Sequence, residues 1–164
     1  MALLALAVIG VAIAGYLTAV HYTPLPLVCS TTGIIDCARV TSSSYSLVPG
    51  TSLPITVPGI LWFLVSGALA GASLAQKGPM GPVRLVHVTW AACGMLAALY
   101  LVFIEIVRLH RICLWCSAAH LLLVASFLIA LSRLQALGGA LDEPEGGDGD
   151  VSPADRATVA GRPL

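Results

Sequence analysis

Four of the five cysteines form two pairs whose spacing and surroundings point to thiol chemistry. Cys113 and Cys116 enclose two residues, which is the spacing of proteins that exchange thiols and disulfides. Cys29 and Cys37 form a wider pair in the longest polar segment of the chain. Both pairs adjoin long apolar runs, so the sequence predicts a redox relay at a membrane surface.

The narrower pair is placed where a thiolate, the attacking form of cysteine, is favoured. The pKa of a cysteine falls beside cations and at a helix N-terminus. Cys113 opens an apolar run of helix length and follows Arg108, His110 and Arg111. We therefore expect Cys113 to be the attacking thiol. Cys116 lies about one helical turn further on, so we expect its sulfur to face an apolar oxidant in the membrane.

The composition is that of a polytopic membrane protein. Apolar residues make up 58% of the chain and charged residues 10%, and the mean hydropathy is +0.95. The formal net charge of zero, without a basic cluster, argues against a nucleic-acid partner. We expect membrane lipid around an all-α bundle of four helices, near residues 3–20, 57–75, 83–107 and 113–132.

The first apolar run is predicted to be a retained span rather than a cleaved signal peptide. No Lys or Arg precedes it, and only a weak cleavage site follows it. The long polar segment 21–54 comes next, and it is the only loop large enough to build a site. Within it, Asp36 is predicted to cap a short helix from Cys37 to about Tyr45.

The two remaining links are short and force antiparallel neighbours. A Gly/Pro-rich turn at 76–82 joins the second and third helices, and residues 108–112 join the third and fourth. Both cysteine pairs then lie at one face of the membrane and both termini at the other. We divide the chain into a transmembrane redox domain, 1–135, and a disordered, acidic, Gly/Pro-rich cytoplasmic tail, 136–164.

Charge alone does not orient the bundle, because three cations flank each face. Lasting dithiol–disulfide exchange belongs in an oxidising compartment, so we place the cysteine face outside the cytoplasm. The cations on the terminal side are Lys77, Arg84 and Arg133, and those on the cysteine side are Arg39, Arg108 and Arg111.

The combined spacing resembles the vitamin K epoxide reductase family and its bacterial quinone-reducing homologues. Seven residues separate Cys29 from Cys37, Ser43 follows six positions later, and the narrower pair opens the fourth helix. The resemblance extends over roughly residues 16–132. The bacterial disulfide-bond B family also has four helices and two pairs, but there the narrower pair comes first.

This resemblance implies a role for each site residue. Cys113 and Cys116 would be the active pair, with Cys116 contacting a quinone, either menaquinone or ubiquinone, and no metal involved. Cys29 and Cys37 would be the shuttle, and Cys37 would exchange with Cys113. Ser43, which has a serine on each side, would match the family's loop serine. Electrons would come from a separate thioredoxin-fold disulfide oxidase.

Two departures from the animal pattern favour a bacterial quinone reductase over vitamin K epoxide reduction. The segment 53–59 lacks the asparagine of animal members, and His120 stands where they carry tyrosine. We expect His120 and Trp115 at the quinone, with His120 donating to a carbonyl or else bonded within the interior. The implied location is the inner (plasma) membrane of a bacterium.

Simpler interpretations apply to several of these residues. The chain could be a non-catalytic membrane scaffold with structural disulfides, since a bridge between Cys29 and Cys37 would pin a long loop. The same two residues are too far apart for the usual zinc site. Cys93, alone within the third apolar run, is predicted to be a packing residue. Glu105 is predicted to form an ion pair with Arg108, three residues later.

Overall fold

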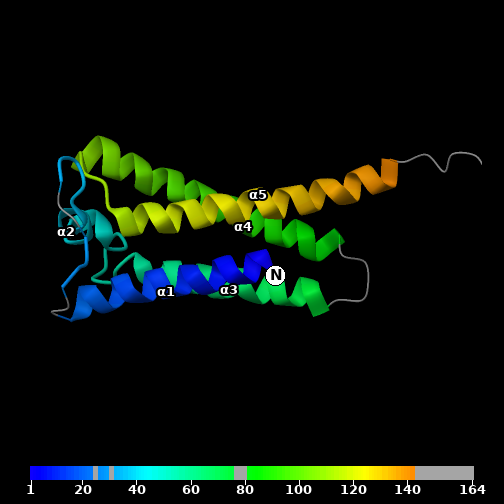
Figure 1. Ribbon diagram of the computed structural model, residues 1–164, viewed down its shortest axis with the longest axis horizontal. Helices are drawn as coiled ribbons and strands as arrows, with labels where there is room; N and C mark the ends of the chain where they lie inside the picture. The colour runs from blue at the N-terminus through cyan, green and yellow to red at the C-terminus, as the bar shows by residue number, and fades with distance from the viewer. Residues whose placement is uncertain (24–25, 30–31, 76–80, 143–164) are drawn as a thin grey trace, which may run out of the picture.

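Four long helices make up the bundle in the computed structural model, which describes residues 1–23, 26–29, 32–75 and 81–142 (Figure 1). They are α1 (Ala2–Tyr22), α3 (Thr56–Ala75), α4 (Gly81–Phe103) and α5 (Leu114–Asp142). The described residues hold four helices long and apolar enough to cross a membrane, at Ala2–Tyr22, Thr56–Ala75, Pro82–Leu109 and Leu114–Ala136. This confirms the predicted all-α membrane bundle.

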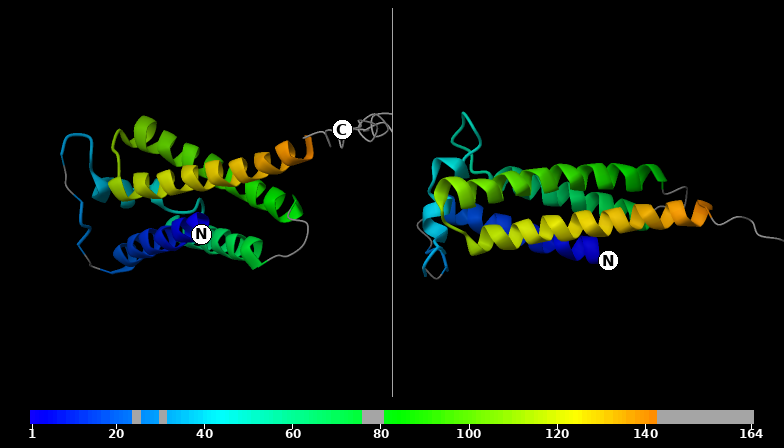
Figure 2. Two further views of the ribbon diagram at one scale, coloured as in Figure 1. Left: turned by 45° about the vertical axis from the view of Figure 1, so that its right-hand side comes forward. Right: turned by 90° about the horizontal axis from the view of Figure 1, so that it is seen from above.

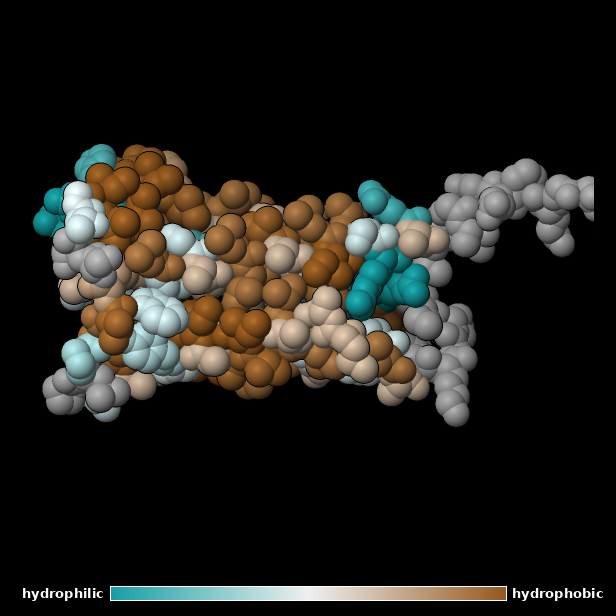
Figure 3. Space-filling view, in the orientation of Figure 1, coloured by the Kyte–Doolittle hydropathy of each residue, from teal (hydrophilic) through white to brown (hydrophobic). Residues whose placement is uncertain are grey.

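The outside of the bundle is apolar, unlike the surface of a water-soluble protein. Large apolar side chains such as Val8, Leu96 and Leu121 are about two-thirds exposed. Figure 3 shows apolar residues covering the middle of one face, with polar residues gathered toward the two ends. A continuous apolar surface of this kind matches surrounding lipid.

Small residues bring α1 and α3 into close contact. Gly10 lies against the ring of Phe63, and a Cβ at Gly67 would meet the Ala7 methyl at 3.3 Å. Backbones can approach this closely only where side chains are small. Gly71 has no neighbour within 4 Å of where a Cβ would lie, so not every small residue of α3 serves this contact.

Two tryptophans join α3 to α4. The rings of Trp62 and Trp90 are stacked with centroids 6.4 Å apart, and each indole N–H donates to the other residue's carbonyl at 3.4 Å. The Trp90 N–H also donates to the Ser66 hydroxyl at 3.1 Å. These residues therefore tie two helices together inside the bundle.

The loop between α1 and α3 carries two short helices, α2 (Cys37–Thr41) and a 3-10 helix, η1 (Ser44–Ser46). The predicted cap is confirmed, because the Asp36 carboxylate accepts the N–H of Arg39 at 3.0 Å. The helix nevertheless ends before the predicted Tyr45. Ser43 adopts an extended conformation, and its hydroxyl donates to the Val40 carbonyl at 2.8 Å in place of a further helical turn.

The cysteine-bearing elements meet at one end of the bundle. The long loop, α2 and the beginning of α5 lie together at the left in Figure 1, away from the end of α5, and both views in Figure 2 agree.

The predicted Gly/Pro turn is mostly outside the described residues. Helix α5 continues through Asp142, beyond the predicted boundary at 135, because its glycines weaken a helix without breaking it. The rest of the predicted tail is not described.

Candidate thiol redox site

The two cysteine pairs are in different redox states. Cys29 and Cys37 form a disulfide with their Cα atoms 6.1 Å apart, whereas Cys113 and Cys116 are free thiols. Sequence left three possible connectivities open for four cysteines. The structure selects the pairing within the loop.

One sulfur of each pair is deeply buried, and these two residues belong to one cluster. Cys37 is 1% exposed and Cys113 is 0% exposed, and both pack in a core cluster with Val40. Cys29 and Cys116 are partly buried and pack against the same cluster. We call Cys37 and Cys113 the inner cysteines and the other two the outer cysteines. The pairs therefore meet through their inner members.

A backbone bridge explains why the inner cysteines meet. Ile35 pairs in parallel with Ile112, just before α5. The Ile112 N–H donates to the Ile34 carbonyl at 2.9 Å, and the Asp36 N–H donates to the Ile112 carbonyl at 3.1 Å. Cys113 directly follows Ile112, and Cys37 directly follows Asp36, whose N–H bonds the Ile112 carbonyl. The bridge thus sets the register between the loop and α5.

The outer cysteine of the loop is positioned by what we call the aromatic clamp, Tyr16 and Trp115. The Trp115 indole N–H donates to the Val28 carbonyl at 2.8 Å, and the Tyr16 hydroxyl accepts the Val28 N–H at 3.0 Å. The two rings lie 5.0 Å apart. We predicted Trp115 at the quinone, but in the first turn of α5 it reaches the segment before Cys29 and lines neither cavity described below.

Hydrogen bonds favour the thiolate of the inner cysteine on α5. The pKa of Cys113 is lowered, mainly by a hydrogen bond from the Cys116 thiol. The Cys116 N–H also donates to the Cys113 sulfur at 3.3 Å. Burial and the charge of Glu105 oppose this shift without reversing it. The predicted help from the preceding cations is not what lowers the pKa.

The sequence interpretation misplaced Glu105, an ionisable side chain beside the narrower pair. Its carboxylate accepts the Cys113 N–H at 3.2 Å, and the residue is 6% exposed. Arg108 is exposed, and within the described residues it makes no ion pair with Glu105, so that prediction is wrong. The cause is a π-helical turn, η2 (Ile104–Leu109), whose wider turn rotates residues three apart away from one another.

Helical spacing contained a signal for the true orientation of Glu105. Ala91 and Ala98 lie on the buried face of α4, and Glu105 continues that face at helical spacing. A carboxyl group at such a position points into the bundle rather than toward a cation on its surface.

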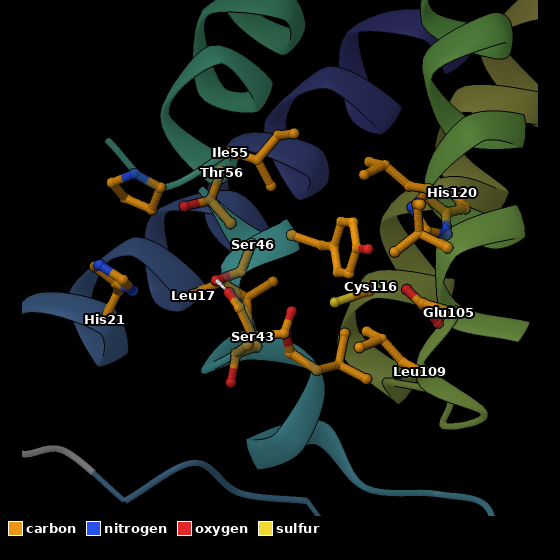
Figure 4. A pocket seen from close by; sticks show the side chains of 16 residues that line it. Leu17, His21, Ser43, Ser46, Ile55, Thr56, Glu105, Leu109, Cys116 and His120 are labelled. Carbon is orange, nitrogen blue, oxygen red and sulfur yellow. Dashed lines mark hydrogen bonds between the residues drawn. The ribbon is translucent and has the colours of Figure 1, made fainter. Parts of the chain in front are cut away.

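Two adjoining cavities meet at the outer cysteine of α5. The outer cavity, about 70 Å³, is lined by side chains from the loop, α1, η2 and α5, including Ser43, Glu105, Cys116 and His120 (Figure 4). The deeper cavity, about 300 Å³, is mostly apolar and is lined by all four long helices. Cys116 and His120 line both. A ligand in either cavity would contact the same thiol and imidazole.

His120 has an unused hydrogen-bonding atom in this region. The residue is 8% exposed, and its Nδ1 is buried with no partner in the described part of the chain. The alternative of an internally bonded histidine is therefore wrong for that nitrogen. Buried polar atoms rarely lack a partner, so the atom is suited to a ligand.

Cys93 lies outside this site. It is exposed on α4, so the prediction that it packs inside the bundle is wrong. Its neighbours Ala91 and Gly94 occupy the buried face, and the helical repeat turns Cys93 outward.

A four-helix membrane bundle in which a disulfide packs against a free CxxC pair has the character of a membrane redox protein. The chain belongs to the vitamin K epoxide reductase family, whose family model matches residues 1–131. That match spans both cysteine pairs and nearly all of the four helices. No curated protein matches the chain. The family resemblance in the cysteine spacing is thereby confirmed.

Proposed function

We propose that the protein passes electrons from a separate thioredoxin-fold partner, through its two cysteine pairs, to a membrane quinone, and so supports disulfide formation. One observation carries this proposal. The inner cysteines share a buried cluster, while the outer cysteine of α5 lines two cavities within the membrane span. Such an order of sulfurs connects a protein substrate to a lipid-soluble one.

Exchange along this path conserves bonds at each step. A thiolate of the reduced partner attacks the loop disulfide at Cys29, and Cys37 leaves as a thiolate. Cys37 then attacks Cys113 in the oxidised narrow pair, which releases Cys116. The partner's second thiolate then attacks its own sulfur in the mixed disulfide and releases Cys29. Cys29 attacks Cys37 in the Cys37–Cys113 bond, which re-forms the loop disulfide and releases Cys113. The loop is oxidised and the narrow pair reduced in the structure, which corresponds to the stage before the narrow pair is reoxidised.

The deeper cavity has the character of a quinone site. It is apolar, it lies between the membrane-spanning helices, and His120 offers a nitrogen that could bond a quinone carbonyl. Ser43 lines the outer cavity, but its hydroxyl already donates to a backbone carbonyl. A quinone, menaquinone or ubiquinone, would accept two electrons from the narrow pair.

We place the cysteine end on the outer face of a bacterial plasma membrane. Repeated cycling between dithiol and disulfide requires an oxidising compartment on the side where a secreted partner folds. The scaffold alternative is less well supported, because the narrow pair is a pair of free thiols rather than a structural bridge.

Quinone reduction by the purified protein tests this function. The full chain in detergent is expected to reduce ubiquinone-1 with dithiothreitol as electron donor, whereas Cys113→Ala and Cys116→Ala lose this activity by at least about 1,000-fold. Cys93→Ala is the matched control, because it removes a cysteine outside the site, and it should leave the rate unchanged. A quinone-independent chain whose narrow pair never reoxidises would support the scaffold instead.

A further inference from the structure

A buried carboxyl group lies beside the narrower cysteine pair, and the electron path proposed above does not use it. Glu105 is 6% exposed and lies within the candidate span Pro82–Leu109. The next three residues on the π-helical turn, 106–108, are all exposed, whereas Glu105 faces inward. Ionisable side chains at membrane depth are costly and commonly mark proton relays or ligand sites.

The two oxygens of this carboxyl group have different surroundings. Oε2 accepts the Cys113 N–H at 3.2 Å, while Oε1 accepts no hydrogen bond from the described residues. The side chain lines the outer cavity with Cys116 and His120, as Figure 4 shows. Glu105 is thus bonded to the backbone of one cysteine and shares a cavity with the thiol of the other.

Reoxidation of the narrow pair by a quinone moves protons as well as electrons. Two S–H bonds break, one S–S bond forms, and two O–H bonds form on the reduced ring. These protons need a carrier that reaches both the Cys116 sulfur and the ring, and Glu105 lines the outer cavity, which shares Cys116 and His120 with the deeper one. A carboxyl group with one free oxygen can serve as such a carrier.

We propose that Glu105 carries the proton of the Cys116 thiol to the quinone, an assignment that rests on the proposed function. The carboxylate takes this proton as Cys116 gives its electrons to the ring, and the acid then donates it to one ring oxygen. Cys113 closes the disulfide as a thiolate, and the other ring oxygen takes from solvent the proton that Cys113 had released there. The pair has lost two electrons and two protons, the ring has gained them, and Glu105 is again a carboxylate.

The simpler alternative is that Glu105 only fixes the start of α5 through the Cys113 N–H. Glu105→Gln separates the two roles, because the amide oxygen still accepts that hydrogen bond but the side chain no longer carries a proton. The other titratable groups around Glu105 belong to α1, η1 and the start of α5, and they are His21, Tyr45, Cys113, Cys116 and His120.

A single-turnover experiment isolates the step. The full chain in detergent is reduced with dithiothreitol, freed of reductant and mixed with ubiquinone-1, and remaining thiols are counted over time. Glu105→Gln is expected to slow reoxidation by about 100-fold, the usual weight of a proton-transfer group. The wild-type rate should rise with pH as the carboxyl group ionises, and this limb should vanish in Glu105→Gln. Arg108→Gln, an exposed change on the same turn, should leave rate and pH profile unchanged.

Two further measurements keep the result interpretable. Reduction of the Cys29–Cys37 disulfide by dithiothreitol should proceed at the wild-type rate in Glu105→Gln, which shows that the fold is intact. Glu105→Asp, which keeps the carboxyl group, should retain the pH limb.

Three results would contradict the proposal, each in a different way. Reoxidation of Glu105→Gln within about twofold of wild type would reduce Glu105 to a structural role. An equal loss in Arg108→Gln would assign the effect to charge on the turn. If the wild-type pair is not reoxidised by any quinone, the proposed function fails first and the proton relay falls with it.

Discussion

The loop pair and the helix pair of cysteines differ in what holds them in place. The helix pair lies at the start of α5, where its geometry is fixed by the helix itself. The loop pair depends on other elements, namely the backbone bridge to Ile112 and the aromatic clamp from α1 and α5. Each pair nevertheless has one inner and one outer sulfur. The difference teaches that the four cysteines form an ordered series, from a loop surface to a membrane cavity.

Under the proposed function, that order also separates the two kinds of substrate. A protein partner needs a sulfur on an accessible segment, and Cys29 occupies irregular chain at the loop end. A quinone needs a sulfur that faces an apolar cavity, and Cys116 lines one. The inner cysteines are almost fully buried. In this order of sulfurs, neither substrate has to reach them.

Removal of the loop pair gives the largest effect that would break this comparison. Cys29→Ala and Cys37→Ala are expected to abolish quinone reduction driven by a reduced thioredoxin-fold protein, because the shuttle is lost. Dithiothreitol is small enough to reduce the helix pair directly, so the rate with this donor should fall by no more than about threefold. Equal failure with both donors would show that the loop pair does more than serve the protein partner.

The aromatic clamp should have a smaller and donor-specific effect. Trp115→Phe keeps the ring but deletes the hydrogen bond to Val28, which is worth about 1 kcal/mol. We expect turnover with the protein donor to fall by about threefold to tenfold, and turnover with dithiothreitol to be unchanged. Trp90→Phe, which changes an interhelical tryptophan remote from the loop, is the matched control. A loss confined to the dithiothreitol reaction would return Trp115 to the quinone site.

The smallest expected effect is a shift in the pH at which the Cys113 thiol ionises. The pKa of Cys113 is lowered chiefly by the hydrogen bond from Cys116, so its thiolate should persist at lower pH than an ordinary thiol. Cys116→Ala removes that donor and should move the thiolate absorbance transition to higher pH. Cys116→Ser keeps a hydroxyl donor and should move it less. Identical transitions in both variants would assign the shift to the helix N-terminus.

Hydropathy and cysteine spacing were sufficient to predict the frame of this molecule. The four spans follow from apolar runs of membrane length, and the capped helix at Cys37 follows from Asp36. An even number of spans places both pairs at one end, because short connections force antiparallel neighbours. These signals are local, so they can be read from a single sequence.

The contacts that build the site were not readable in this way. The bridge between Ile35 and Ile112 joins distant segments through backbone atoms, which carry no sequence mark. The π-helical turn separates Arg108 from Glu105, and nothing in their residue types announces that turn, although helical spacing does place Glu105 on the buried face. Trp115 bonds a carbonyl that any residue at position 28 would offer.

Trapping a bond between the inner cysteines tests the ordered series most directly. In the double variant Cys29→Ala, Cys116→Ala, mild oxidation should convert most of the protein to a Cys37–Cys113 disulfide, detected by mass spectrometry after proteolysis. In Cys37→Ala, Cys116→Ala, the remaining Cys29 and Cys113 should crosslink far less. If the first variant stays reduced, or if the second crosslinks as readily, then electrons do not cross between the pairs at the inner cysteines.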